Sequence, residues 1–198
     1  AATSTAKDTG LPPTPSEKLL PPTPTPAVTP QAPSGALAAG TTIKVETDVF
    51  LAEISTAGGD LRRLEFRQHR DIDDHKRNFV LFQQRPDHTY IAQSGLLGAE
   101  LPNHRTQYTA ASTQYTLGSA DKMLEVRLEA PAAGGVKVTK IYRFHRDSYL
   151  IDVIFELTNQ SAAAIQPYGY FQVLRDDKAP AGDSAMLPTY TGIAVHTD

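Results

Sequence analysis

An alternation of apolar and polar side chains, repeated in several short runs, is the feature that most narrows the folds open to this chain. In the longest run, residues 149–159, apolar side chains occupy every second position, while Asp152 and Glu156 fall on the opposite face. Successive side chains of a β-strand point to opposite faces of a sheet, so a period of two predicts a strand with one buried face. Shorter runs of this kind lie at residues 43–46 and 124–129. The chain is therefore predicted to be built from half-buried β-strands.

Glycine pairs and short connections separate these runs. Gly58-Gly59 and Gly134-Gly135 each lie between two strand-like runs, and glycine readily adopts the positive φ angles of tight hairpins. The connection at residues 146–148 is too short for the crossover that joins parallel strands. Residues 69–78 could form a polar turn or a short helix, and no segment has the pattern of a helix of three turns. We predict an all-β fold of mostly antiparallel strands, a sandwich or an open barrel.

The first forty residues differ in composition from the rest of the chain. Nine of the fifteen prolines lie between Pro12 and Pro33, and the first aromatic residue is Phe50. Such a segment has too little apolar surface to offset the entropy lost on ordering, and repeated proline favours an extended chain. We predict that residues 1–40 form a flexible linker and that residues 41–198 form a β-sandwich domain.

Charge, cysteine content and apolar run length exclude several classes of protein. The net charge is −3, so attraction to nucleic acid is not expected. The chain has no cysteine, which excludes disulfides, thiol nucleophiles and cysteine zinc sites. No run reaches the roughly 18 apolar residues that a membrane span needs.

The residues most suited to a metal ion lie close together in one polar segment. They are His69, Asp71, Asp73, Asp74 and His75. The two histidines are six residues apart, which fits neither adjacent helical turns nor an HExxH motif, and three basic residues nearby supply counter-charges. We expect a solvated, self-neutralising loop, and we assign no metal or other cofactor.

A second candidate is a nucleophilic serine, Ser94, with a histidine as its base. The possible bases are His88, His104 and His145. The elbow that activates such a serine has the sequence GxSxG, and Ala92 replaces its first glycine. We expect Gln93, Ser94 and Gly95 to end a strand and make a turn, and we assign no catalytic residue.

Aromatic residues near the C-terminus offer a third possibility, ligand binding. The cluster comprises Tyr168, Tyr170, Phe171 and Tyr190. Tyrosines frequently line sugar and peptide sites, and they also fill sandwich cores. Alternation puts Tyr168 and Tyr170 on one face of a strand and Phe171 on the other, so about half of the cluster is expected to be packing. Both roles stay open, and no partner-binding residue is identified.

The chain ends directly after another alternating segment, residues 193–198, without a polar tail. We therefore expect this chain to be part of a longer protein whose missing neighbours carry the main activity.

Four segments, taken in order, resemble the large periplasmic domain of the YidC/Oxa/Alb membrane protein insertases of Gram-negative bacteria. They are residues 45–66, 90–98, 141–159 and 190–198. The shared features are a Thr-Asp at the end of the opening strand, a Thr-x-Gly-Gly turn, a Gln-Ser-Gly-Leu stretch and an Arg-Asp hairpin before the long strand. The resemblance spans residues 41–198. It implies an antiparallel β-supersandwich with a galactose mutarotase-like architecture, whose C-terminal part is missing here.

The resemblance also implies a function for the whole protein. It implies a multi-pass inner-membrane protein that inserts and folds other membrane proteins, alone or with the Sec translocon, with this domain on the periplasmic face. The groove that accepts incoming polypeptides belongs to the membrane core, so no insertase residue is carried over. The implied partners are SecDF and nascent membrane proteins, bound through a strand edge or a cleft. The domain itself is expected not to be an enzyme.

An alternative hypothesis is a carbohydrate-binding or aldose-epimerase-like protein of the same architecture. Sugar epimerases of that fold resemble one another in using a histidine acid and a glutamate base in one cleft. Here His145 and Glu156 fall on consecutive predicted strands, and nothing in the sequence shows that they converge.

Overall fold

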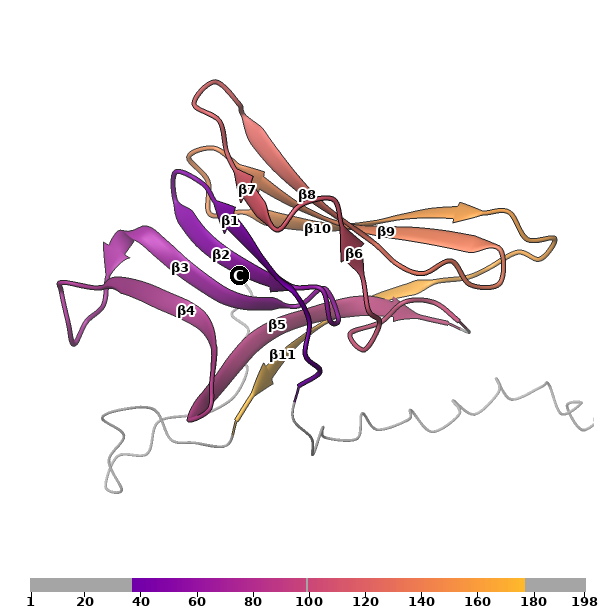
Figure 1. Ribbon diagram of the computed structural model, residues 1–198, viewed down its shortest axis with the longest axis horizontal. Helices are drawn as coiled ribbons and strands as arrows, with labels where there is room; N and C mark the ends of the chain where they lie inside the picture. Colours follow the sequence, from indigo (N-terminus) through magenta and orange to yellow (C-terminus); the bar gives the residue numbers. More distant parts are fainter. Residues whose placement is uncertain (1–36, 99, 177–198) are drawn as a thin grey trace, which may run out of the picture. The chain divides into compact units, whose positions relative to one another are not determined.

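The computed structural model describes residues 37–98 and 100–176, which form eleven strands in two sheets and contain no α-helix (Figure 1). The larger sheet consists, in spatial order, of β11 (Tyr168–Arg175), β5 (His88–Leu97), β4 (Asn78–Arg85), β3 (Leu61–Arg70), β2 (Phe50–Ser55), β1 (Thr42–Glu46) and β7 (Gln114–Thr116). The smaller sheet consists of β10 (Ile151–Asn159), β9 (Val136–His145), β8 (Met123–Glu129) and β6 (Thr109–Ala110). The predicted all-β fold is confirmed.

The strand pairing is antiparallel except between β1 and β7. Gly58 and Gly59 connect β2 to β3 with φ angles of 78° and 58°. Gly134 and Gly135 connect β8 to β9 with φ angles of 55° and 78°. Both glycine hairpins predicted from the sequence are therefore present. Residues 71–77 form the turn between β3 and β4, where a polar turn or short helix was expected.

The core lies between the two sheets and receives the apolar side chains of the alternating strands, except that Tyr149, the first residue of the longest run, precedes β10 and is 45% exposed. Its members from β1, β2, β8 and β9 include Ile43, Val45, Ile54, Val126, Leu128 and Phe144, all of them buried. Each such side chain contributes about 1.5–3 kcal/mol through removal from water. A smaller apolar cluster is centred on Leu96, Leu101, Val136 and Val138. Strand β10 spans both clusters, because Ile151 and Val153 pack on the first while Phe155 and Leu157 pack on the second.

The expectation for Gln93, Ser94 and Gly95 is wrong. These residues lie inside β5, which continues to Leu97, and they pair with β11. Two physical reasons explain the difference. The side chains of Gln93 and Ser94 are buried among polar partners, and Gly95 leaves room for the side chain of Tyr170, whose hydroxyl would lie 2.6 Å from an added Cβ.

Some predictions fall on residues outside the described part of the chain. These are almost all of the predicted linker at residues 1–40, Tyr190, and the alternating segment at residues 193–198. Within residues 37–98 and 100–176, no helix is long and apolar enough to cross a membrane.

Candidate functional site

Five polar side chains lie buried between the two sheets, and we call them the interior polar cluster. They are Asp60, Gln93, Tyr108, Lys140 and Tyr142. Lys140 belongs to β9, where the alternation of the strand puts it on the buried face together with Val138 and Tyr142. Asp60 directly follows the glycine pair of the β2–β3 turn. The cluster is therefore assembled from segments far apart in the sequence.

Lys140 has no exposed surface, and its ammonium group donates three hydrogen bonds to main-chain carbonyls. The acceptors are Gly59 O at 2.8 Å, Ser94 O at 3.0 Å and Gly58 O at 3.2 Å. Its Nζ also lies 5.4–5.9 Å from the ring centroids of Tyr142, Phe155 and Tyr108, a range in which cation–π attraction acts. Because Lys140 belongs to the smaller sheet and its acceptors to the larger one, these bonds fasten the sheets together.

Asp60 is the acidic member of the cluster and is only 1% exposed. Its Oδ2 accepts a hydrogen bond from Gln93 Nε2 at 2.9 Å and lies 3.7 Å from Arg62 Nη2. Burial raises the pKa of Asp60, while the Gln93 hydrogen bond and the charges of Lys140 and Arg62 act in the opposite direction. Gln93 in turn accepts a hydrogen bond from Gln172 at 2.8 Å, so strand β11 is tied to the cluster as well.

The tyrosine hydroxyls of the cluster stay protonated, because burial raises the pKa of both Tyr108 and Tyr142. Tyr142 donates its hydroxyl to Gly59 O at 2.6 Å. The Tyr108 hydroxyl is buried, and it has no hydrogen-bond partner within the described residues. Gly59 O thus receives two donors and becomes the most heavily bonded carbonyl of the turn.

The geometry of Lys140 indicates a structural role. Burial lowers the pKa of Lys140 to about 7, against the attraction of Asp60. A lysine of lowered pKa is also typical of general-base and Schiff-base sites. Such a lysine faces a cleft that a substrate enters, whereas the N–H groups of Lys140 all face main-chain carbonyls in the interior. The ammonium group holds the β2–β3 turn against β9 and β5.

We expect the free energy of unfolding to rise between about pH 7.5 and 9.5, a window set by the Lys140 pKa of about 7. In this window the unfolded chain keeps the proton on Lys140, whose ordinary pKa is 10.5, while the folded chain has released it. A state that binds more protons loses population as pH rises, so folding gains up to about 1.4 kcal/mol per pH unit from this group. Urea denaturation at three pH values measures the slope. A flat or falling free energy would contradict the assignment.

In the segment predicted to be a solvated loop, residues 69–75, the carboxylates bond to neighbouring groups of the same turn. Asp71 Oδ1 accepts the main-chain N–H groups of Asp73 at 2.9 Å and Asp74 at 3.2 Å, and these bonds hold the pKa of Asp71 below its usual value. Asp74 pairs with Arg77 at 3.0 Å. His69 packs 5.3 Å from the Tyr149 ring instead of facing the loop. In the part of the chain that the structure describes, no group of three or more His, Asp or Glu side chains is placed to hold a metal ion.

Ser94 and its candidate bases are not brought together. Ser94 is buried in β5. His88 Nδ1 lies 3.3 Å from an Asp176 carboxylate oxygen, and His145 Nε2 lies 2.8 Å from Asp152 Oδ2. His104 Nδ1 lies 2.5 Å from the hydroxyl of Tyr170. Each histidine therefore faces a partner other than Ser94.

The C-terminal aromatics divide between two environments, as expected for a strand. Tyr170 is half-buried and binds the main-chain N–H of His104 at 3.0 Å, whereas Phe171 is 64% exposed. Tyr168 is exposed as well, although it was expected to share the environment of Tyr170. It lies at the first position of β11, opposite Leu97 at the end of β5, where less of the sheet covers it.

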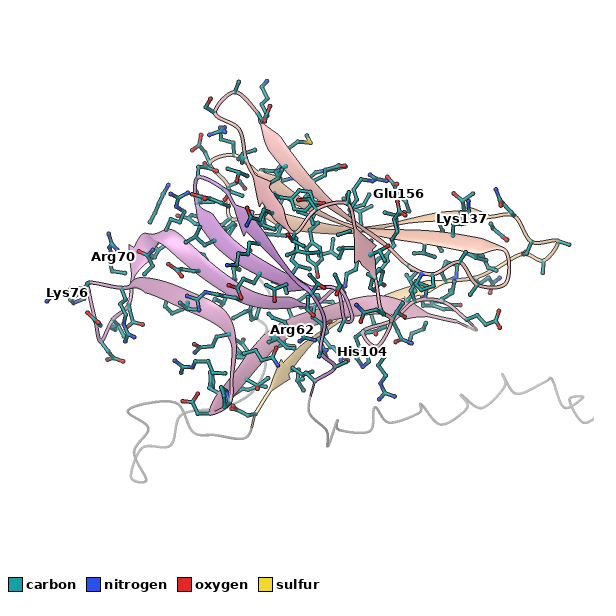
Figure 2. All side chains as sticks on the ribbon, in the orientation of Figure 1. Arg62, Arg70, Lys76, His104, Lys137 and Glu156 are labelled. Carbon is teal, nitrogen blue, oxygen red and sulfur yellow. The ribbon has the colours of Figure 1, made fainter. Side chains whose placement is uncertain are left out.

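The histidine and glutamate of the carbohydrate hypothesis lie far apart. Glu156 is opposite Thr139 in the β9–β10 register, and His145 is six residues further along β9, a separation of about 20 Å. Glu156 pairs with Arg127 on the smaller sheet, and His145 pairs with Asp152. Figure 2 shows Glu156 and Lys137 on this sheet, away from Arg62 and His104. The structure does not form the acid–base pair.

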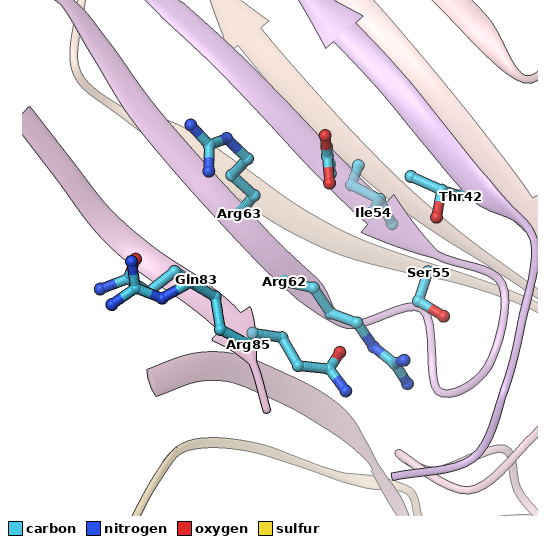
Figure 3. A pocket seen from close by; sticks show the side chains of 9 residues that line it. Thr42, Ile54, Ser55, Arg62, Arg63, Gln83 and Arg85 are labelled. Carbon is cyan, nitrogen blue, oxygen red and sulfur yellow. The ribbon is translucent and has the colours of Figure 1, made fainter. Parts of the chain in front are cut away.

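A polar pocket of about 300 Å³ lies on the larger sheet, and we call it the arginine pocket (Figure 3). Strands β1 to β4 supply its walls: Thr42, Glu53, Ile54, Ser55, Arg62, Arg63, Gln83, Gln84 and Arg85. Glu53 and Arg63 are opposite one another in the β2–β3 register, and they point away from the core that Ala52 and Leu64 enter. Each arginine has a carboxylate partner outside the pocket lining, Asp60 for Arg62, Glu65 for Arg63 and Asp87 for Arg85, and the N–H groups left over can bind an anion.

Neither the interior polar cluster nor the arginine pocket was predicted. For Lys140 a sequence signal exists, because the period of two in residues 136–144 places this lysine among valines and aromatics on the apolar face. The pocket has no comparable signal. It combines side chains of four strands whose spacing depends on the strand register, including a register shift in β3.

Comparison with known proteins shows that the sequence of this chain matches one family. The family model described as the YidC periplasmic domain matches residues 42–198. A "Membrane protein insertase YidC" of Nitrosospira multiformis is 51% identical over 164 residues, which are 83% of this chain and 29% of that protein. Proteins of the same name in Nitrosomonas europaea and Dechloromonas aromatica are 48% and 42% identical, over 82% and 100% of this chain and 27% and 35% of those proteins. The chain thus spans between 27% and 35% of the length of these three relatives.

Proposed function

The chain belongs to the family of YidC periplasmic domains, and on this premise we propose that it is the periplasmic domain of a membrane protein insertase of the bacterial inner membrane. In the whole protein, the membrane part inserts and folds inner-membrane proteins, alone or with the Sec translocon. The observation that carries this proposal is the family match over residues 42–198 together with relatives that carry the insertase name.

Within that protein, the domain docks partners and does not perform a reaction. The pairing of its ionisable side chains supports this role. The lysine with the lowered pKa is bonded to three carbonyls in the interior, and each candidate histidine faces a tyrosine or a carboxylate. The lysine and the three histidines considered as catalytic groups thus each have a partner within the described residues.

The partners that fit this role are the SecDF component of the secretion machinery and extended segments of nascent membrane proteins. Strand edges offer a way to bind such segments, because an extended peptide can add to an edge through main-chain hydrogen bonds. Among the described strands, β10 pairs on one side only, with β9, and it is nine residues long. An edge of this length accommodates an extended peptide without any special side-chain motif.

The proposal is tested in the whole insertase by replacing the span that matches residues 42–198 with a glycine–serine linker. We expect the variant to insert a test membrane protein into vesicles, because the insertion activity belongs to the membrane part. We also expect it to lose co-purifying SecDF. The matched control replaces only residues 1–40 by a linker of equal length, and it keeps SecDF because the β domain is intact.

A further inference from the structure

The arginine pocket carries more hydrogen-bond donors than its own residues use. Arg63 Nη2 bonds Glu65 at 2.6 Å, and Arg85 Nε lies 3.4 Å from Asp87 Oδ1. The remaining N–H groups of these two guanidinium groups have no acceptor among the described residues, and neither do the side-chain amides of Gln83 and Gln84. Arginine presents its donors as a planar fork that matches the oxygens of phosphate and carboxylate groups.

Arg62 lies deeper than the other two arginines, with a side chain that is 15% exposed. Its Nη2 donates to Ala38 O at 3.0 Å and to Ala57 O at 3.4 Å, which fixes the direction of the guanidinium group. Its Nε is buried and has no hydrogen-bond partner within the described part of the chain. A buried donor without an acceptor costs about 1–3 kcal/mol. Arg62 thus forms the inner wall of the pocket, and the N–H groups that a ligand can reach belong to the more exposed Arg63 and Arg85.

Glu53 supplies a hydrogen-bond acceptor on the wall of the same pocket. Its carboxylate makes no ion pair or hydrogen bond with another described residue, although Arg63 is directly opposite it in the strand register. A carboxylate ion only accepts hydrogen bonds. A ligand of this pocket therefore needs an anionic group for the arginines and a hydroxyl group for Glu53.

We propose that the arginine pocket binds a phosphate ester of a small polyol, the glycerol phosphate group being the simplest example. A phosphate ester presents several acceptor oxygens, which matches the two exposed arginines, Arg63 and Arg85, and the two glutamine amides better than the two oxygens of a carboxylate. The polyol hydroxyl groups reach Glu53. A volume of about 300 Å³ holds a ligand of this size. The same group occurs as a free polyol phosphate and in the headgroup of phosphatidylglycerol.

Calorimetric titration of the whole 198-residue chain tests the proposal with three probes: glycerol 3-phosphate, inorganic phosphate and glycerol. We expect saturable binding of glycerol 3-phosphate, weaker binding of inorganic phosphate and no binding of glycerol. The double variant R63Q/R85Q weakens glycerol 3-phosphate binding by at least about tenfold, because it removes two charge-assisted contacts. The control R127Q removes a similarly exposed arginine from the smaller sheet and changes the affinity by less than about twofold.

A further variant tests the hydroxyl contact separately from the charge. Glu53→Gln weakens the binding of glycerol 3-phosphate and leaves that of inorganic phosphate unchanged or stronger. The substituted arginines are partly exposed and their ion pairs are worth little, so we expect the double variant to keep the circular dichroism spectrum of the parent chain.

Vesicle flotation distinguishes the two sources of the phosphate. Binding to phosphatidylglycerol vesicles that is absent for phosphatidylcholine vesicles and for R63Q/R85Q assigns the pocket to the lipid headgroup. Binding of soluble glycerol 3-phosphate without vesicle binding assigns it to a free polyol phosphate. The proposal is overturned if no phosphate probe binds saturably, or if R63Q/R85Q binds as tightly as the parent chain.

Discussion

Replacing Lys140 by methionine lowers the free energy of unfolding by about 3–5 kcal/mol, the cost typical of removing one partner from a buried charged group. Methionine fills a similar volume but donates no hydrogen bond. The substitution leaves Gly58 O and Ser94 O without their Lys140 donor, and it leaves Asp60 buried without its basic partner. Equilibrium unfolding in urea at pH 6, below the Lys140 pKa of about 7 so that the ammonium form is present, measures the loss by circular dichroism.

Lys137 is the matched control for this substitution. It lies three residues earlier on the same strand, is exposed and makes no hydrogen bond or ion pair with another described residue. Lys137→Met should change the free energy of unfolding by less than about 0.5 kcal/mol. A Lys140→Met variant as stable as this control would show that the ammonium group does not fasten the sheets.

The second large effect is expected for Gly58→Ala, which should destabilise the domain by about 3 kcal/mol. Gly58 has a φ angle of 78°, which disfavours a side chain. An added Cβ would lie 2.4 Å from His104 O and 2.6 Å from Asp60 Oδ1, so either the turn or Asp60 has to move. Movement of the turn also displaces two carbonyls that bind Lys140. Thermal and urea unfolding report the change.

The control for this substitution is Gly169→Ala in β11. An added Cβ there meets no heavy atom within 4 Å, and its φ angle is not in the left-handed region. We expect the stability to be unchanged or raised by up to about 1 kcal/mol, because alanine reduces the entropy of the unfolded chain. Equal losses at the two glycines would mean that the turn geometry is not responsible.

Much of the fold follows from local patterns in the sequence. The run at residues 149–159 predicts β10 because its period of two is long and because one face of a strand must meet a core. The pairs Gly58-Gly59 and Gly134-Gly135 predict hairpins because their φ angles are positive, which is a local property of the backbone. The family resemblance is confirmed by the match over residues 42–198.

The wrong prediction for residues 93–95 and the failure to predict the interior polar cluster have the same physical cause. Both features depend on contacts between distant segments of the chain. Gln93 and Ser94 are residue types common in turns, but here they lie in a buried strand. Asp60 accepts a hydrogen bond from the Gln93 side-chain amide, and Lys140 donates one to the main-chain carbonyl of Ser94. Lys140 looks like a surface residue by type, and its burial is possible only because three carbonyls converge on it. These contacts join residues 33 to 82 positions apart, and such distant contacts produce no local sequence pattern from which they could be predicted.

The central claim, that this domain docks partners for an insertase whose activity lies elsewhere, is tested most directly by the amount of SecDF that co-purifies with the whole protein. Replacing the span of residues 42–198 by a linker should reduce the co-purified SecDF by at least about tenfold, a loss of roughly 1.4 kcal/mol or more in binding, while membrane insertion continues. Undiminished SecDF in the linker variant would contradict the account.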